Sequence, residues 1–230
     1  MLLVSGLGLN KLDLTPRLFY EQPYTDLSTA GRFDAEYFTP RMQNLIAALS
    51  RDRLIIADVA KLAKRQFRRK PGVEFQYIEI GDVTGNGIAD SNLVSEEAPS
   101  RATWIVKPND VITTTVRPIR RLSAIIMCEQ DGYVCSSGFA VLTPTTIEPE
   151  LLLVYLRLPL VCELLDLHTT ASMYPSISTT DLMKTPIALP NKEIREQIVE
   201  KVRASFAASH EARWLLDEAK AMVEKAILKE

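Results

Sequence analysis

The chain has 230 residues, of which 47% are hydrophobic and 24% charged, and its formal net charge is -2. This composition is ordinary for a globular protein with a substantial core, and it excludes a disordered or fibrous chain. The longest apolar runs fall far short of the roughly 20 residues that cross a bilayer, and the first residues lack the charged and apolar regions of a signal peptide. We therefore expect a cytoplasmic protein.

The cysteines are Cys128, Cys135 and Cys162. Their number is odd, and they have neither CxxC spacing nor histidines close by. We therefore expect free thiols in a reducing compartment rather than a disulfide or a zinc site.

The first part of the chain leads into a helix. Residues 1–31 show no clear hydrophobic period, and we interpret them as a variable lead-in. Thr39 and Pro40 are a typical cap and first residue for a helix that ends near Ser50. Leu54 and the apolar residues after it predict a short strand or helix that leads to a basic run.

The basic run is a dense group of positive charges. Six bases and no acid fall within residues 61–70, namely Lys61, Lys64, Arg65, Arg68, Arg69 and Lys70. The acids are concentrated in the following stretch, residues 74–97, so a negative net charge does not exclude a local basic surface. The run is either a solvated loop or a contact to nucleic-acid phosphates.

Most strand signals lie between Phe75 and Val141. Residues 75–80 alternate in polarity before a turn that contains Asn86 and Gly87. Further strands are expected at 102–106, 111–116, 122–127 and 133–141. We predict an α+β fold with a mixed, largely antiparallel, meander-like sheet that helices cover on one face.

Three arginines follow the strand at 111–116, namely Arg117, Arg120 and Arg121. Arginine suits bidentate contacts to guanine or phosphate, and strand ends hold side chains on a rigid base. The alternative is surface pairing with acids such as Glu129 or Asp131.

Helical periodicity dominates the last third of the chain. Residues 148–168 predict a helix that Pro159 kinks or divides. A hydroxyl-rich loop, an extended segment at 185–190 and one helix over 191–230 follow, with Asn191 as its cap. Small and apolar residues at heptad spacing predict a coiled-coil seam, made of Ile198, Val202, Ser205, Ser209, Ala212, Leu216, Ala219, Val223 and Ala226. The alternative is that this helix folds back on the body.

Catalytic and cofactor motifs are missing. The sequence has no GxxxxGK[ST], no GxGxxG and no GxSxG, and its two histidines have no clear orienting carboxylate. We expect no cofactor, no metal and no catalytic residue in this chain. A small enzyme that uses Cys135 or Ser137 remains a third-ranked alternative.

Ordered sequence blocks resemble a known family. The blocks are Tyr-Ile-Glu-Ile-Gly-Asp-Val at 77–83, Pro-Ser-Arg-Ala at 99–102, Val-Lys-Pro-Asn-Asp-Val-Ile at 106–112, Thr-Val-Arg-Pro at 115–118 and Ser-Ser-Gly-Phe-Ala-Val-Leu at 136–142. From about Arg32 onward, their order resembles the target-recognition domain in specificity subunits of type I restriction-modification systems. The resemblance implies a DNA target-recognition domain over 32–190 and, over 191–230, a helix for dimerisation and methyltransferase docking.

The same resemblance implies the chemistry of the partners. Methyltransferase subunits would bind S-adenosylmethionine and flip an adenine for N6 methylation, and a restriction subunit would add ATP-dependent cleavage. The specificity subunit itself would read double-stranded DNA without catalysis. The loop before the last strand resembles the corresponding loop of the family, which implies DNA contacts for Ser172 and Tyr174. Ala171 stands where the family usually has glycine, and this departure puts those contacts in doubt.

Full specificity subunits of that family carry two recognition domains on two long helices. One domain and one helix predict a half-subunit that pairs as a homodimer and reads an inverted repeat. Two alternatives are an excised half of a longer subunit and a protein-interaction scaffold or orphan remnant that acts through its coiled coil.

Overall fold

The computed structural model describes residues 2–17, 19–68, 72–95, 99–170 and 173–228. The N-terminal elements are α1 (Leu2–Gly6), η1 (Leu9–Lys11), α2 (Tyr24–Ala30), α3 (Ala35–Phe38) and α4 (Pro40–Leu49). Thr39 caps α4 as predicted, because its side chain accepts a hydrogen bond from the Met42 backbone at 3.3 Å. Arg69, Lys70 and Ser172, three of the predicted DNA-contacting residues, lie outside the described residues.

The strands form two four-stranded sheets. The first has the order β2-β9-β6-β7 and the second β4-β3-β8-β5. The strands of the first sheet are β2 (Ala60–Leu62), β6 (Val111–Thr114), β7 (Ser123–Ile125) and β9 (Phe139–Pro144), and those of the second are β3 (Phe75–Ile78), β4 (Asn92–Val94), β5 (Ala102–Ile105) and β8 (Val134–Ser136). The described pairs within these sheets are antiparallel except β3 with β8, so the largely antiparallel prediction is confirmed.

The expected meander is wrong, because the chain changes sheet after β5. Asn109 takes a left-handed conformation with φ of 67°, and the Asp110 carboxylate accepts a hydrogen bond from the Lys107 backbone at 2.8 Å. This tight turn directs β6 away from β5 and into the first sheet. Strand β7 forms a hairpin with β6, whereas β8 and β9 pair with strands distant in sequence, β8 with β5 and β9 with β6.

Alternating residues of the first sheet face two different cores. On β6, Val111 belongs to the core that the helices cover, and Ile112 belongs to the core shared with the second sheet. On β9, Leu142 and Val141 divide in the same way. The first sheet is therefore the middle layer of three, which explains why its strands are apolar on both faces and why their alternation in sequence is only partial.

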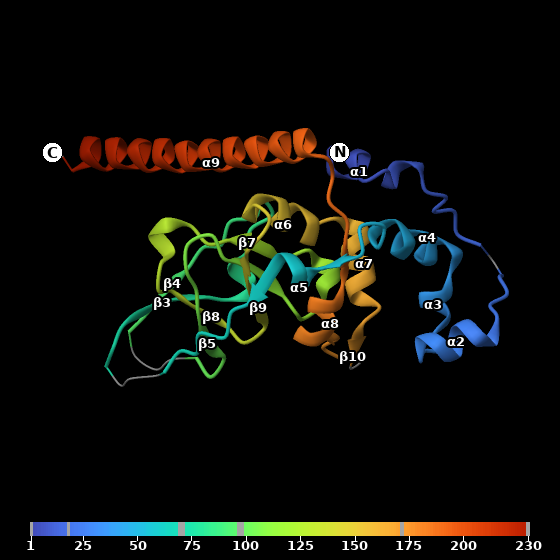
Figure 1. The fold of residues 1–230 in the computed structure, drawn as a ribbon. Helices are drawn as coiled ribbons and strands as arrows, with labels where there is room; N and C mark the ends of the chain where they lie inside the picture. Colours follow the sequence, from blue (N-terminus) through green and yellow to red (C-terminus); the bar gives the residue numbers. More distant parts are fainter. Residues whose placement is uncertain (1, 18, 69–71, 96–98, 171–172, 229–230) are drawn as a thin grey trace.

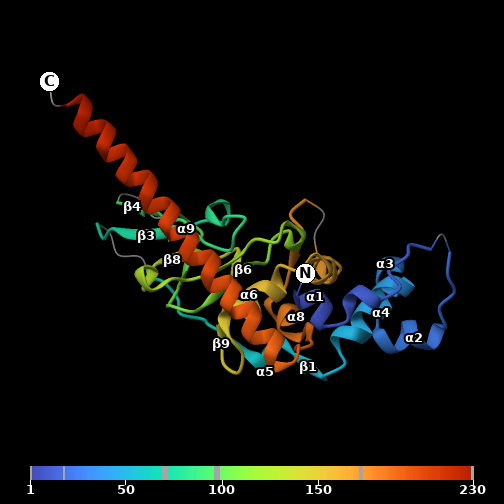
Figure 2. The same ribbon diagram turned by 90° about the horizontal axis from the view of Figure 1, so that it is seen from above.

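Helix α6 (Pro149–Leu156) covers the outer face of this middle sheet, and α7 (Pro159–Asp166) packs beside it against α6 and α4 (Figures 1 and 2). Pro159 begins α7, so the predicted division of the 148–168 helix is confirmed. The remaining elements are β1 (Leu54–Ile55), α5 (Ile56–Val59), η2 (Ile80–Asp82), η3 (Pro118–Arg120), η4 (Cys128–Gln130), β10 (Thr169–Thr170), β11 (Ser176–Ile177), α8 (Thr179–Lys184) and β12 (Pro186–Ile187).

The last helix, α9 (Lys192–Ile227), is continuous, and Asn191 caps it by accepting from the Ile194 backbone at 2.9 Å. Its contacts with the body include the ion pair of Arg213 with Asp90 at 2.8 Å, and its C-terminal end extends past the body (Figures 1 and 2). Ile198 is 4% exposed, and Val202 packs against the same core. Their assignment to a partner seam is corrected, because their side chains are already used by the domain.

The beginning of the chain also contributes to the core. Leu3, Leu7 and Leu9 are buried in the same cluster as α4, α6 and Ile198. A side chain at Gly6 would come within 2.9 Å of Ile194, so a glycine allows α1 to approach α9. Of the helices in the part of the chain that the structure describes, none combines the length and the apolar character needed to span a membrane.

Candidate nucleic-acid interface

The predicted strand-end arginines lie on one exposed loop. The arginine loop, residues 117–121, connects β6 to β7 and contains η3. Arg117, Arg120 and Arg121 are exposed, and among the described residues none of the three forms an ion pair, so the alternative of pairing with Glu129 or Asp131 is not seen there. Three exposed arginine side chains thus extend from a short, rigidly based loop.

The backbone of this loop is strained at both ends. Arg117 has φ of 50° and Arg121 has φ of 58°, a left-handed conformation that costs a side-chain-bearing residue about 1 kcal/mol or more. Such strain persists only where surrounding contacts determine the backbone. The contacts that do so here come from a hairpin on one side and from Arg157 on the other.

The hairpin of β10 and β11 holds Arg117. The Arg117 backbone N–H donates to Pro175 O at 2.8 Å, and its guanidinium donates to Met173 O at 3.0 Å. The guanidinium carbon also lies 5.5 Å from the centre of the Tyr174 ring, within cation–π range. The structure therefore brings together Arg117 and Tyr174, which are far apart in sequence and were both predicted to contact DNA.

The base of the hairpin is fixed by Arg32. Its guanidinium donates to Asp34 at 2.7 and 2.8 Å and to Leu167 O at 2.8 Å, and it lies 3.1 Å from His168 Nδ1. Burial lowers the pKa of His168, and the positive charge of Arg32 lowers it further. These shifts favour the neutral form of His168, which lies immediately before β10 with Arg32 and Asp34 around it.

Arg157, at the end of α6, supports the arginine loop from the other side. Its guanidinium donates to Arg121 O at 3.1 Å and to Ser123 O at 2.9 Å, and it also donates to Gly85 O. Burial lowers the pKa of Arg157, and the charge of Arg121 adds to this shift. Nothing in the sequence singled out Arg157, because its bonds depend on three loops that only the tertiary structure brings together.

The basic run divides into surface and structural residues. Lys64 and Arg68 are exposed, whereas Arg65 pairs with the buried carboxylate of Asp110 and donates to Ile105 O at 3.0 Å. The prediction that Arg65 contacts phosphate is corrected, because its guanidinium neutralises an internal acid. Sequence patterns did not indicate this partner, which lies 45 residues further along the chain.

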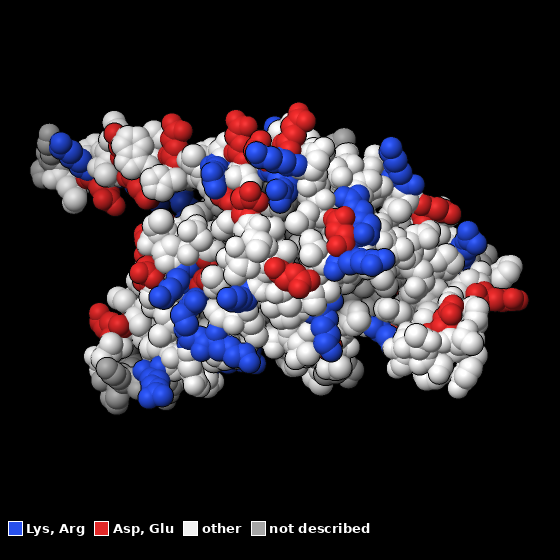
Figure 3. All heavy atoms as spheres, in the orientation of Figure 1, with Lys and Arg blue, Asp and Glu red and all other residues white. Residues whose placement is uncertain are grey.

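The run lies along the edge strand β5. Gln66 forms an antiparallel bridge with Trp104, and Phe67 N donates to Thr103 O at 2.7 Å. Exposed bases therefore gather along this edge from the basic run and from both ends of β5, namely Lys64, Arg68, Arg101 and Lys107. In Figure 3, lysine and arginine atoms gather over the region of β5, β8 and β9, on the side of the domain away from α9. The β10 hairpin also lies on that side (Figure 1).

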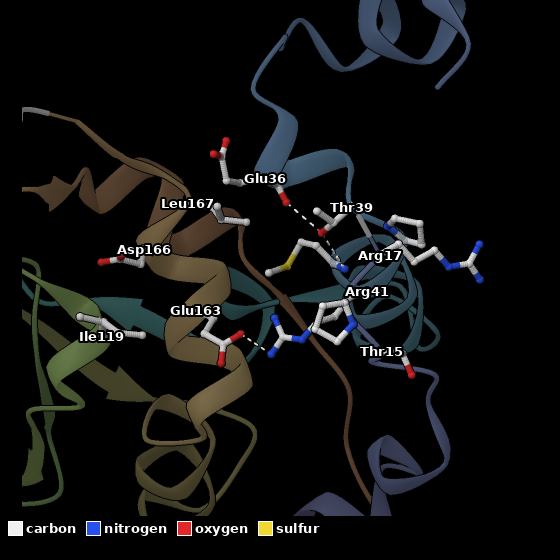
Figure 4. A pocket seen from close by; sticks show the side chains of 12 residues that line it. Thr15, Arg17, Glu36, Thr39, Arg41, Ile119, Glu163, Asp166 and Leu167 are labelled. Carbon is white, nitrogen blue, oxygen red and sulfur yellow. Dashed lines mark hydrogen bonds and ion pairs between the residues drawn. The ribbon is translucent and has the colours of Figure 1, made fainter. Parts of the chain in front are cut away.

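A cavity of about 450 Å³ lies behind the arginine loop (Figure 4). The lead-in, α3, α4, α7 and Ile119 of the arginine loop line it, and an ion pair between Arg41 and Glu163 at 2.5 Å joins α4 to α7 across it. Among the described residues that line the cavity, no nucleophile lies beside a base.

The Cys135 thiol, one of the two candidate nucleophiles, is buried. Burial raises the pKa of the Cys135 thiol to about 12, and the charge of Asp110 contributes to this shift. A thiol with such a pKa is not a thiolate near neutral pH. Among the described residues, no group of histidine, cysteine and acidic side chains could hold a metal ion.

Solved structures with the same fold define the class of protein. One chain, from work on complex assembly and conformational transition of the type I R-M system, shares 28% identity with a TM-score of 0.58 over 74% of this chain. The HsdS subunit from Thermoanaerobacter tengcongensis shares 29% identity with a TM-score of 0.56 over 74% of this chain. The chain spans 46% of the length of each of these relatives.

The model of the type I restriction modification DNA specificity domain matches residues 56–213. That match covers more than half of the sequence, and the chain belongs to this family. No curated protein sequence matches it.

Proposed function

We propose that this chain binds double-stranded DNA in a sequence-specific manner as the recognition part of a type I specificity subunit. The observation that carries the proposal is the arginine loop fastened to the β10 hairpin, with Arg117 bonded to Met173 O and stacked near Tyr174. A loop fixed in this way presents guanidinium groups in a defined geometry, which bidentate contacts to base edges require.

The bases along the edge of β5 supply the sequence-independent part of binding. Lys64 and Arg68 are exposed, and Arg101 and Lys107 flank β5 itself. Lysine and arginine at such an edge contact phosphates and set the position of the protein on the duplex. Base reading by the arginine loop and phosphate contacts by these bases together form one interface.

Catalysis belongs to other subunits in this proposal. Methyltransferase subunits would bind S-adenosylmethionine and carry out adenine-N6 methylation, and a restriction subunit would hydrolyse ATP. The buried, unactivated Cys135 thiol is consistent with a chain that does not itself catalyse a reaction.

The C-terminal end of α9, which extends past the body, is the proposed surface for a partner helix. Leu216 and Val223 are 63% and 57% exposed, and Ala212 and Ala219 lie on the same helical face between or beside them. Small and apolar residues at this spacing allow close packing of a second helix. We propose that a second copy pairs here and that methyltransferase subunits dock along the resulting helices.

An electrophoretic shift assay tests the proposal. The full chain, alone and with a methyltransferase partner, is titrated against a pool of random duplexes and against the sequence recovered from it. We expect a defined sequence to be enriched, and we expect Arg117→Ala to lose preference for it. Equal affinity for every duplex in both preparations would contradict sequence-specific recognition and favour the scaffold alternative.

A further inference from the structure

Arg157 lies where three segments of the domain meet. It ends α6, and its guanidinium reaches the carbonyls of Arg121 and Ser123 on one side and of Gly85 on the other. Its side chain is half-buried and faces the arginine loop from within the domain. All three acceptors are main-chain oxygens, so these hydrogen bonds depend on the position of the backbone and not on which side chains the acceptor residues carry.

The carbonyl of Arg121 is the critical acceptor. Arg121 occupies the left-handed region with φ of 58°, and only Leu122 separates it from β7, which begins at Ser123. A bond to Arg121 O and another to Ser123 O fix the two ends of that short connection. The N-terminal end of the loop is held separately by the hairpin, through Arg117 N and Pro175 O.

The third acceptor is anchored to rigid structure. Gly85 begins the turn in which Gly87 has φ of 87°, and a Cβ at Gly87 would come within 2.8 Å of Leu153. Asn86 in the same turn donates to Ser209 Oγ of α9 at 3.3 Å. Arg157 therefore connects the arginine loop to a turn that is packed on α6 and bonded to α9.

From this geometry we propose that Arg157 is a specificity-determining positioning residue, which sets the backbone of the arginine loop without touching DNA. The inference rests on the proposed function, since it requires that the arginine loop reads bases. Lysine cannot replace it, because one ammonium group cannot span acceptors on two sides as the planar guanidinium does. Without these hydrogen bonds Arg121 can leave its strained conformation, so the side chains of Arg120 and Arg121 are no longer held in position while phosphate contacts at β5 stay intact.

The test uses the full chain, the duplex that it selects from a random pool, and a scrambled duplex of equal length. We expect Arg157→Lys and Arg157→Gln to reduce the preference for the selected duplex at least tenfold. Affinity for the scrambled duplex, and its salt dependence, should change less than twofold. The lost preference should fall at the same base pairs that Arg120→Ala loses, a result that general destabilisation would not produce.

A matched control is Arg51→Lys, at a position away from the arginine loop. The Arg51 guanidinium also donates to two main-chain carbonyls, Leu7 O at 3.0 Å and Leu189 O at 3.1 Å. The Arg51→Lys variant should leave the preference unchanged. Should the Arg157 variants not fold, Asn86→Ala removes the bond to α9 at an exposed position and is expected to lower the preference in the same direction.

The outcomes separate the two proposals. If the unmodified chain selects no sequence, the proposed function fails. If it selects one and a folded Arg157 variant, or Asn86→Ala in its place, keeps the full preference, the positioning role is refuted. Equal weakening on both duplexes would also refute it, because Arg157 would then act on general binding or stability.

Discussion

The pair of Arg65 and Asp110 gives a sharp test of the division between structural and DNA-facing bases. Asp110 is 1% exposed, and its carboxylate accepts from Arg65, from Lys107 N at 2.8 Å and from Thr143 Oγ1 at 2.7 Å. Replacing Arg65 with methionine keeps the aliphatic packing but leaves a buried carboxylate without its counter-ion. Breaking a fully buried pair costs about 3 to 5 kcal/mol.

The expected loss here is smaller. Two donors to Asp110 remain, and the side chain of Arg65 is 29% exposed, so water partly replaces the lost charge. We expect Arg65→Met to lower the free energy of unfolding by about 2 to 3 kcal/mol. For a chain of this size that corresponds to a drop in melting temperature of roughly 4 to 12 °C.

Urea unfolding followed by circular dichroism measures this loss of unfolding free energy. The matched control is Arg68→Met, which should change stability by less than about 0.5 kcal/mol because Arg68 is exposed. The double variant Arg65→Met with Asp110→Asn should be less destabilised than the sum of the two single variants, since the uncompensated charge is gone. A stable Arg65→Met variant with weakened DNA binding would refute the structural assignment and restore the phosphate contact.

Four further predictions concern charge, assembly and ligands. The pKa of His168 lies below its ordinary value of 6.5 in the folded chain, so the unfolded chain binds more protons as the pH falls below 6.5. The contribution of His168 to stability should therefore be fully present above about pH 6.5 and be lost as the pH is lowered through that value. Thermal melts at pH 7.5 and 5.5 should show this loss, and it should be smaller in His168→Asn. The double variant Lys64→Ala with Arg68→Ala should weaken binding to all duplexes and flatten the salt dependence by about one unit of slope per lost phosphate contact. Arg117→Ala or Arg120→Ala should instead cost about 1 to 3 kcal/mol of binding free energy at one base pair. Identical behaviour of the two sets across a panel of sites would contradict this division. Leu216→Glu with Val223→Glu should give monomers in analytical ultracentrifugation, and an unmodified chain that is monomeric at tens of micromolar would disprove pairing through α9. Calorimetric titration should detect neither S-adenosylmethionine nor ATP binding to the isolated chain, and micromolar affinity for either would overturn the non-catalytic assignment.

Local signals in the sequence identified the elements but not all of their partners. The Thr39 and Asn191 caps and the break at Pro159 follow from residue chemistry within one turn, and the structure has all three. The separation of β5 from β6 could not be predicted, because it depends on which distant strand pairs with each of them. An apolar residue at every position of a strand shows that both faces are covered, but not whether a helix or a second sheet covers them.

The same distinction applies to the candidate site. Exposed guanidinium groups at 117–121 were predictable from a strand followed by arginines, whereas the bond from Arg117 to Met173 and the support by Arg157 join segments 34 or more residues apart. Arg65 and Arg68 are indistinguishable by residue type within one basic run, and only the position of the buried Asp110 separates them. The seam on α9 was ambiguous for a similar reason, since Ile198 and Leu216 have the same helical spacing but only Ile198 meets the body.

The most direct test of the central claim is selection of duplexes from a random pool by the full chain, followed by sequencing of the bound fraction, with and without a methyltransferase partner. The unmodified chain should enrich one defined sequence, and Arg117→Ala should lose the preference at one or two of its base pairs while still binding DNA. An unmodified chain that enriches no sequence in either preparation, or an Arg117→Ala variant with an unchanged preference, would contradict recognition through the arginine loop.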